Sequence, residues 1–196
     1  MYNIQNLNLN NKKLSEIPKE IGYLMNLKTL YLYDNCLVEI PERLGSLKNL
    51  QTLDLSCNKL TKIPKEIGGL TNLKTLSLSN NKLTELPISF GNLINLKTLL
   101  LSNNLLSKLP KELNNLINLK TLDISFNELT EIPKEITDLI NLKTLLLSNN
   151  SLSKIPKEIG NLTNMILSLE NNPLTEIPKE IVKNKKIKYF VNSNKK

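Results

Sequence analysis

Two aspartates are the first candidates for chemistry in this sequence. Asp54 and Asp123 each stand between two aliphatic residues, and this alternation predicts a strand whose middle side chain faces outward. Paired carboxylates can hydrolyse a glycosidic bond when they lie at most about 9.5 Å apart. These two aspartates belong to sequence repeats three apart, so strands about 4.8 Å apart would separate them by roughly 14 Å. They are too distant to act as one catalytic pair.

The other residue types offer little for catalysis or metal binding. The chain has no histidine, which removes the commonest general base and metal ligand, and it has no glycine-rich phosphate loop or CxxC pair. Cys36 and Cys57 fall two residues out of register in neighbouring repeats, which places their Cα atoms roughly 8 Å apart, beyond disulfide reach. We therefore expect no catalytic residue, metal site or cofactor, and two free thiols in a reducing compartment.

Charge and hydropathy argue against several other functions. The net charge is +8, but six lysines follow the last acid, Glu180, so much of the excess is a basic tail that we expect to be solvated. Aromatic residues make up 4% of the chain and tryptophan is absent, so a base-stacking nucleic-acid groove is not expected. No apolar run approaches the roughly 20 residues of a membrane span. The first residues lack the features of a signal peptide, which predicts a cytoplasmic protein. If the sequence lacks its leader, the alternative is a secreted one.

The elements that position these residues repeat at a fixed step. Prolines recur every 23 residues, and the last follows after 22: Pro18, Pro41, Pro64, Pro87, Pro110, Pro133, Pro156 and Pro178. A period of this length indicates one small unit that buries its apolar face only by stacking on copies of itself. We expect one elongated domain of about eight repeats over residues 1–182. Residues 183–196 are expected to be a closing segment with the basic tail, in which Ile187 and Phe190 form a partial ninth strand over the last coil.

Aligned on its leucines, the unit reads LxxLxLxxNxLxxIPxxIGxLxNL. The alternation sends Leu30 and Leu32 inward and Tyr31 outward, so each unit supplies one short strand and successive strands run parallel. The motif resembles the leucine-rich repeat family, in its typical 23-residue class and its intracellular type without cysteine caps. The resemblance implies an α/β repeat, a right-handed solenoid or horseshoe with a parallel β-sheet on the concave face and short helical turns on the convex face.

One asparagine per unit directly follows the strand, where the chain must turn. A turn buried between coils leaves backbone groups that need partners, and an amide offers both donors and an acceptor. Because the residue does not vary among the repeats, we predict a structural asparagine ladder rather than a ligand-binding stripe. Its members are Asn35, Asn58, Asn81, Asn104, Asn127, Asn150 and Asn172.

The outward face of the strands is where the repeats differ. Tyrosines and exposed apolar residues on rigid strands are typical of binding hot spots, although drift between duplicated repeats is an open alternative. A basic stripe also crosses the sheet (Lys28, Lys74, Lys97, Lys120 and Lys143), and it either steers acidic partners or only adds solubility. The candidate residues form an N-terminal patch of Tyr31, Tyr33, Asp34 and Asp54, and a middle patch of Leu100, Asp123, Phe126 and Leu146.

The family resemblance implies a non-catalytic protein–protein interaction module, acting as a scaffold, adaptor or effector. It is expected to bind a protein partner on the concave face, to act as a monomer and to have no small-molecule substrate. One alternative is a secreted or surface leucine-rich repeat protein that binds a receptor or matrix component. Another, binding of nucleic acid or an acidic membrane through the tail, would show steep salt dependence and is not favoured.

Overall fold

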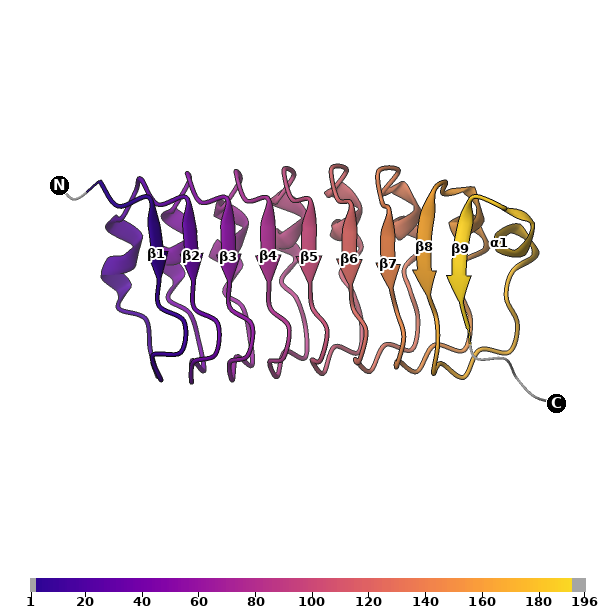
Figure 1. Cartoon of the computed structure of the whole chain (residues 1–196), viewed down its shortest axis with the longest axis horizontal. Coiled ribbons are helices and arrows are strands. Elements are labelled where there is room, and N and C mark those ends of the chain that lie inside the picture. The colour runs from indigo at the N-terminus through magenta and orange to yellow at the C-terminus, as the bar shows by residue number, and fades with distance from the viewer. Residues whose placement is uncertain (1–2, 192–196) are drawn as a thin grey trace.

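The computed structural model describes residues 3–191, in which nine parallel strands form a single sheet in chain order (Figure 1). The short helices lie behind this sheet along the whole length of the molecule. The strands are β1 (Asn6–Asn8), β2 (Thr29–Tyr31), β3 (Thr52–Asp54), β4 (Thr75–Ser77), β5 (Thr98–Leu100), β6 (Thr121–Asp123), β7 (Thr144–Leu146), β8 (Met165–Ser168) and β9 (Ile187–Phe190).

The helical turns of successive coils stack on one another. They are five-residue 3-10 helices except for the last, α1, which is an α-helix. Their bounds are η1 (Lys19–Tyr23), η2 (Glu42–Ser46), η3 (Lys65–Gly69), η4 (Ile88–Asn92), η5 (Lys111–Asn115), η6 (Lys134–Asp138), η7 (Lys157–Asn161) and α1 (Lys179–Lys183). The expected α/β repeat is confirmed.

Each of the eight recurring prolines stands just before its helix rather than at the first helical position. Pro41, for example, has φ −68° and ψ 140°, which is extended backbone, and its carbonyl accepts a hydrogen bond from the Leu44 N–H at 2.9 Å. Proline suits this position for two reasons. Its fixed φ matches the extended backbone before the helix, and it has no N–H that would need a partner where the chain enters the helix. Proline therefore marks the last extended residue of each coil.

The sheet keeps one register along the stack. Leu30 of β2 pairs with Leu53 of β3, and every pairing from β1 to β7 joins residues 23 apart. The step falls to 22 between β7 and β8, where Thr144 pairs with Ile166. Because side chains alternate between the two faces of a strand, this register aligns equivalent positions into straight columns on both faces.

The core is one continuous stack of aliphatic side chains enclosed between the sheet and the helices. Leu27, Leu30, Leu32 and Leu37 of one coil are fully buried, and their equivalents in the following coils are also buried, except for partly buried Leu174 in the last coil. The largest fully buried side chain is Phe90, which takes the place of an isoleucine or leucine in η4. Each coil is only one side chain thick, so its apolar atoms leave water only when coils lie on both sides.

The asparagine ladder joins each coil to the one before it. The Asn104 amide donates to the carbonyls of Leu101 in its own coil and Leu78 in the preceding coil, both at 3.0 Å. Its Oδ1 accepts the N–H of Leu83 at 3.0 Å. The same arrangement recurs at Asn35, Asn58, Asn81, Asn127, Asn150 and Asn172.

A second line of asparagines, which the sequence motif contains but to which we assigned no role, joins the coils where the chain enters each strand. Asn118 donates from its amide to the carbonyl of Ile94 in the preceding coil at 2.8 Å. This outer asparagine row lies at the surface, unlike the buried ladder. It consists of Asn49, Asn72, Asn95, Asn118 and Asn141, each bonded to a carbonyl 24 residues earlier.

The C-terminal coil differs from expectation at one residue. Ile187 is buried as predicted, but Phe190 is half-exposed on the outer face of β9, paired in register with Ser168. Tyr189 and Val191 pack against the core instead. The period-2 alternation of the strand explains the difference, because residues 187, 189 and 191 share the inward face and 190 does not. Phe190 therefore does not cover the last coil.

Substitution of Asn104 by alanine should destabilise the protein far more than substitution of Ser102. Asn104 is buried and serves backbone groups of two coils, whereas half-buried Ser102 makes one side-chain hydrogen bond, to the Ser79 hydroxyl. Each buried backbone group left without a partner should lower the free energy of unfolding by about 1 to 3 kcal/mol. Urea titration of N104A and S102A measures the difference, and equal free energies would contradict a structural role for the ladder.

Candidate functional site

The outer face of the sheet carries side chains in three aligned columns. The first strand residue is threonine from β2 to β7, and the column two residues after the strand is mostly serine. The column between them, at the last strand residue, changes from coil to coil. From β1 to β8 it reads Asn8, Tyr31, Asp54, Ser77, Leu100, Asp123, Leu146 and Ser168.

The N-terminal patch brings its predicted residues together. Tyr31 and Asp54 are direct neighbours in the register of β2 and β3, and Tyr33 and Asp34 follow β2 at the surface. The Cys57 side chain lies against Tyr33. Its electrostatic interaction and hydrogen bond with the phenol are the largest causes that raise the pKa of Tyr33, followed by the Asp34 carboxylate, desolvation and the Asp54 carboxylate. Sequence reasoning left Cys57 out of this patch.

The middle patch is equally contiguous along β5, β6 and β7. Leu100 and Leu146 flank Asp123 in register, and all three side chains are half-buried. Ser125 holds the Asp123 carboxylate by donating to its Oδ1 from the N–H at 3.0 Å and from the hydroxyl at 2.6 Å. Only β4, with Ser77, lies between the two patches. They are thus two parts of one surface.

The carboxylates of this surface are not arranged for catalysis. Asp54 on β3 and Asp123 on β6 are three strands apart, and each is held by a serine of its own coil. Across residues 3–191, no three histidine, cysteine or acidic side chains come close enough to hold a metal ion. Cys36 and Cys57 are both free thiols, as expected.

One position in each coil, three residues after the strand, has left-handed backbone geometry. Asparagine and aspartate tolerate this conformation best among residues with a side chain, and they occupy the position in six of its eight occurrences. The left-handed column consists of Asn11, Asp34, Cys57, Asn80, Asn103, Phe126, Asn149 and Asn171, with φ between 54° and 58°.

Phe126 is the bulky exception in the left-handed column. Its φ is 54° and its side chain is 53% exposed, so packing in the core does not explain its presence. It also interrupts hydrogen bonds along the column, in which Asn103 donates to the Asn80 side chain and Asn171 to that of Asn149, both at 2.8 Å. The fold favours asparagine here, and the chain carries a conformationally unfavourable aromatic residue instead.

The same outer face extends toward the C-terminus with two apolar residues that sequence reasoning missed. Ile166 of β8 stands in the threonine column and is exposed, and Phe190 of β9 is half-exposed. The sequence could have indicated Ile166, because this residue interrupts the run of threonines at the first strand position. It could have indicated Phe190 through the alternation of inward and outward side chains along its strand.

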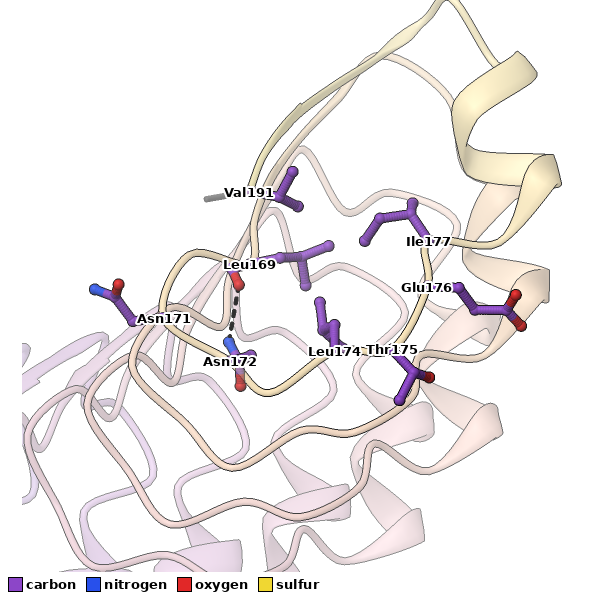
Figure 2. Close-up of a pocket in the computed structure, with 8 residues that line it drawn as sticks. All are labelled: Leu169, Asn171, Asn172, Leu174, Thr175, Glu176, Ile177 and Val191. Carbon is purple, nitrogen blue, oxygen red and sulfur yellow. Dashed lines mark hydrogen bonds between the residues drawn. The ribbon is translucent and has the colours of Figure 1, made fainter. Parts of the chain in front are cut away.

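A pocket of about 250 Å³ lies near the C-terminal end (Figure 2). The side chains of Leu169, Leu174, Ile177 and Val191 point toward one another around it, while Glu176 points away. Asn172 closes one side by donating to the Leu169 carbonyl at 3.0 Å. Glu176 is the only titratable side chain of the lining, so this pocket carries no catalytic arrangement.

Comparison with known families agrees with this geometry. Three family descriptions match in overlapping segments: "Leucine-rich repeat region" over residues 89–166, "Leucine rich repeat" over 48–106 and "Leucine Rich repeats (2 copies)" over 26–67. The chain is a leucine-rich repeat protein. Leucine-rich repeat domains generally mediate protein–protein interaction and are typically non-enzymatic. No curated protein matches the chain.

Solved structures of leucine-rich repeat proteins superpose on nearly the whole chain. A leucine-rich repeat protein of Leptospira interrogans is 44% identical with a TM-score of 0.86 over 95% of this chain, which spans 54% of that protein. Internalin C2 of Listeria monocytogenes is 27% identical, with a TM-score of 0.85, over 96% of this chain and 80% of its own. Internalin F of the same species is 27% identical, with a TM-score of 0.77, over 90% and 51%. The chain thus spans about half the length of the Leptospira protein.

Membrane insertion by a helix finds no support in the fold. None of the helices formed by the described residues is long and apolar enough to cross a bilayer.

Replacing Phe126 by asparagine should stabilise this leucine-rich repeat protein. Asparagine adopts the left-handed conformation more readily, so F126N should raise the free energy of unfolding by about 1 kcal/mol. The matched control is F126A, which also removes the ring but keeps a side chain poorly suited to this conformation. Urea unfolding of both variants is the measurement. If F126N is no more stable than F126A, the backbone conformation of Phe126 carries no appreciable strain.

Proposed function

We propose that this chain is a non-catalytic protein–protein interaction module, a scaffold, adaptor or effector, that binds a protein partner on the concave outer face of its sheet. The contact surface comprises the N-terminal patch and the middle patch. The module acts as a monomer, without cofactor or small-molecule substrate. Its cytoplasmic location is part of the proposal and is supported by the two free cysteines, since oxidising compartments favour disulfides.

The observation that carries the proposal is the conformation of Phe126. A residue held in unfavourable backbone geometry at a surface points to a function that outweighs its cost to stability. Its 53% exposed ring lies in the left-handed column, three residues after Asp123 in the coil that contributes that aspartate to the middle patch. Large aromatic and apolar side chains surrounded by polar groups are typical of binding hot spots.

The rigidity of the face adds further support. Neighbouring strands are joined through their backbones, the asparagine ladder ties their turns together, and Ser56 and Ser125 fix the two aspartates. Side chains that are already ordered before binding lose little conformational entropy when a partner docks. Such a face favours a folded protein surface of complementary shape.

The alternative of a secreted or surface protein that binds a receptor or matrix component uses the same face. It differs in the compartment and in the identity of the partner. Affinity capture from native cells, with the wild-type chain and the concave variants below in parallel, identifies the partner and its compartment together.

Double substitutions on the face should weaken binding of the captured partner while leaving the fold intact. We expect Y31A with Y33A, and L100S with F126S, each to reduce affinity by at least about 1 to 2 kcal/mol, as truncated hot-spot residues commonly do. Isothermal titration calorimetry measures the affinities, and thermal melting verifies folding.

The matched control is the exchange of Lys65 and Glu66 on η3, on the opposite side of the coil, where exposed charges contribute little. Full affinity in both concave variants, with loss in the control, would place the contact on the helical face and overturn the proposal.

A further inference from the structure

Three isoleucines form an exposed apolar row at the side of the sheet where the strands begin. They lie in the segments before the strands, whereas the proposed contact surface lies on the strands and just after them. The isoleucine row consists of Ile94, Ile117 and Ile140, which are 50%, 54% and 73% exposed. Each lies in the segment that leads from a helix into a strand, along the upper edge of Figure 1. Thr71 and Thr163 hold the same position in the flanking coils, so the apolar row is confined to three neighbouring coils.

A row of lysines accompanies the isoleucines. The lysine row consists of Lys97, Lys120 and Lys143, each three residues after an isoleucine and exposed. Within residues 3–191, none of these three ammonium groups forms a hydrogen bond or ion pair with a protein group. Two acids lie near the row in sequence, and both already accept hydrogen bonds. The Asp123 carboxylate, three residues after Lys120, accepts from the N–H and hydroxyl of Ser125. The Asp138 carboxylate, five residues before Lys143, accepts from the Asn114 amide at 3.2 Å. The row therefore presents positive charge that the protein itself does not neutralise.

Backbone hydrogen bonds hold both rows in place. Asn118 and Asn141 of the outer asparagine row donate to the carbonyls of Ile94 and Ile117, both at 2.8 Å. The N–H groups of Lys120 and Lys143 each donate to the carbonyl of the preceding lysine in the row at 2.8 Å. Neighbouring members are thus about one strand spacing, about 4.8 Å, apart. The edge is a straight, preformed ridge with an apolar and a cationic side.

The chemistry of this ridge distinguishes among possible occupants. A second copy docked symmetrically would bring one lysine row against the other, which like charges oppose. Nucleic acid would use the lysines but offers nothing to the isoleucines, because aliphatic side chains provide no stacking platform. The ridge also lacks the tryptophan, tyrosine and arginine that dominate protein hot spots. An anionic lipid surface offers a partner to both rows, because its acyl chains can contact the isoleucines and its negatively charged headgroups can contact the lysines.

We propose that the isoleucine row and the lysine row together form a peripheral docking edge for an anionic lipid surface. The isoleucines enter the boundary between headgroups and acyl chains, and the lysines contact the headgroup phosphates. This leaves the concave face free to hold a protein partner at the membrane.

Co-sedimentation with vesicles tests the proposal on the full chain. The vesicles are phosphatidylcholine alone or phosphatidylcholine with about 30% phosphatidylglycerol. We expect binding to the anionic vesicles only. The triple variants I94S/I117S/I140S and K97Q/K120Q/K143Q should each bind them at least about ten-fold more weakly, since membrane affinity scales with inserted apolar area and with lysines near the surface.

Two control variants match these changes elsewhere on the molecule. V38S/I88S/V182S removes three exposed aliphatic side chains, and K65Q/K111Q/K157Q removes three exposed lysines from the helices. Both controls should bind within about two-fold of the wild type. Failure of the wild type to bind anionic vesicles overturns the proposal, and so does equal weakening by test and control variants. Unchanged vesicle binding with loss of a protein partner in the row variants would instead identify the edge as a protein contact.

Discussion

The structure depends on one constraint: no coil can bury its own leucines. A repeat of 23 residues supplies one inward row of aliphatic side chains, and these leave water only when equivalent rows lie above and below. Stacking in turn places backbone amides and carbonyls between coils, away from solvent, where each needs a partner. The sheet pairs those of the strands, and the asparagine ladder pairs those of the turns. Burial and hydrogen bonding therefore demand the same register.

That register separates the residues of the chain by role. Positions that face the core or bond to the next coil are leucine, isoleucine or asparagine in nearly every repeat, because their neighbours are the same in every coil. Positions that face outward have no such requirement, and the column at the last strand residue varies most from coil to coil. The column from Tyr31 to Leu146 and the row from Ile94 to Ile140 are accordingly free to carry binding chemistry without disturbing the fold.

Phe126 shows where this separation breaks down. The left-handed column belongs to the backbone of the turn, so its residue affects stability, and its side chain also lies at the rim of the outer face. Asparagine serves the turn best, whereas an aromatic ring serves contact best. Cys57 takes a similar place beside Tyr33. At these two positions, the requirements of the fold and those of a binding surface conflict.

The sequence by itself determined the period, the parallel sheet, the buried leucines and the family, because all of these follow from spacing along the chain. It also indicated Ile187 as a core residue and predicted two free cysteines. Only the tertiary structure decided three features: the left-handed turn at Phe126, the hydrogen bonds of the outer asparagine row between coils, and the contiguity of the two patches across β4. These features depend on backbone angles and on contacts between residues 22 to 26 positions apart, which the geometry of the stacked coils sets and a pattern within one repeat does not contain.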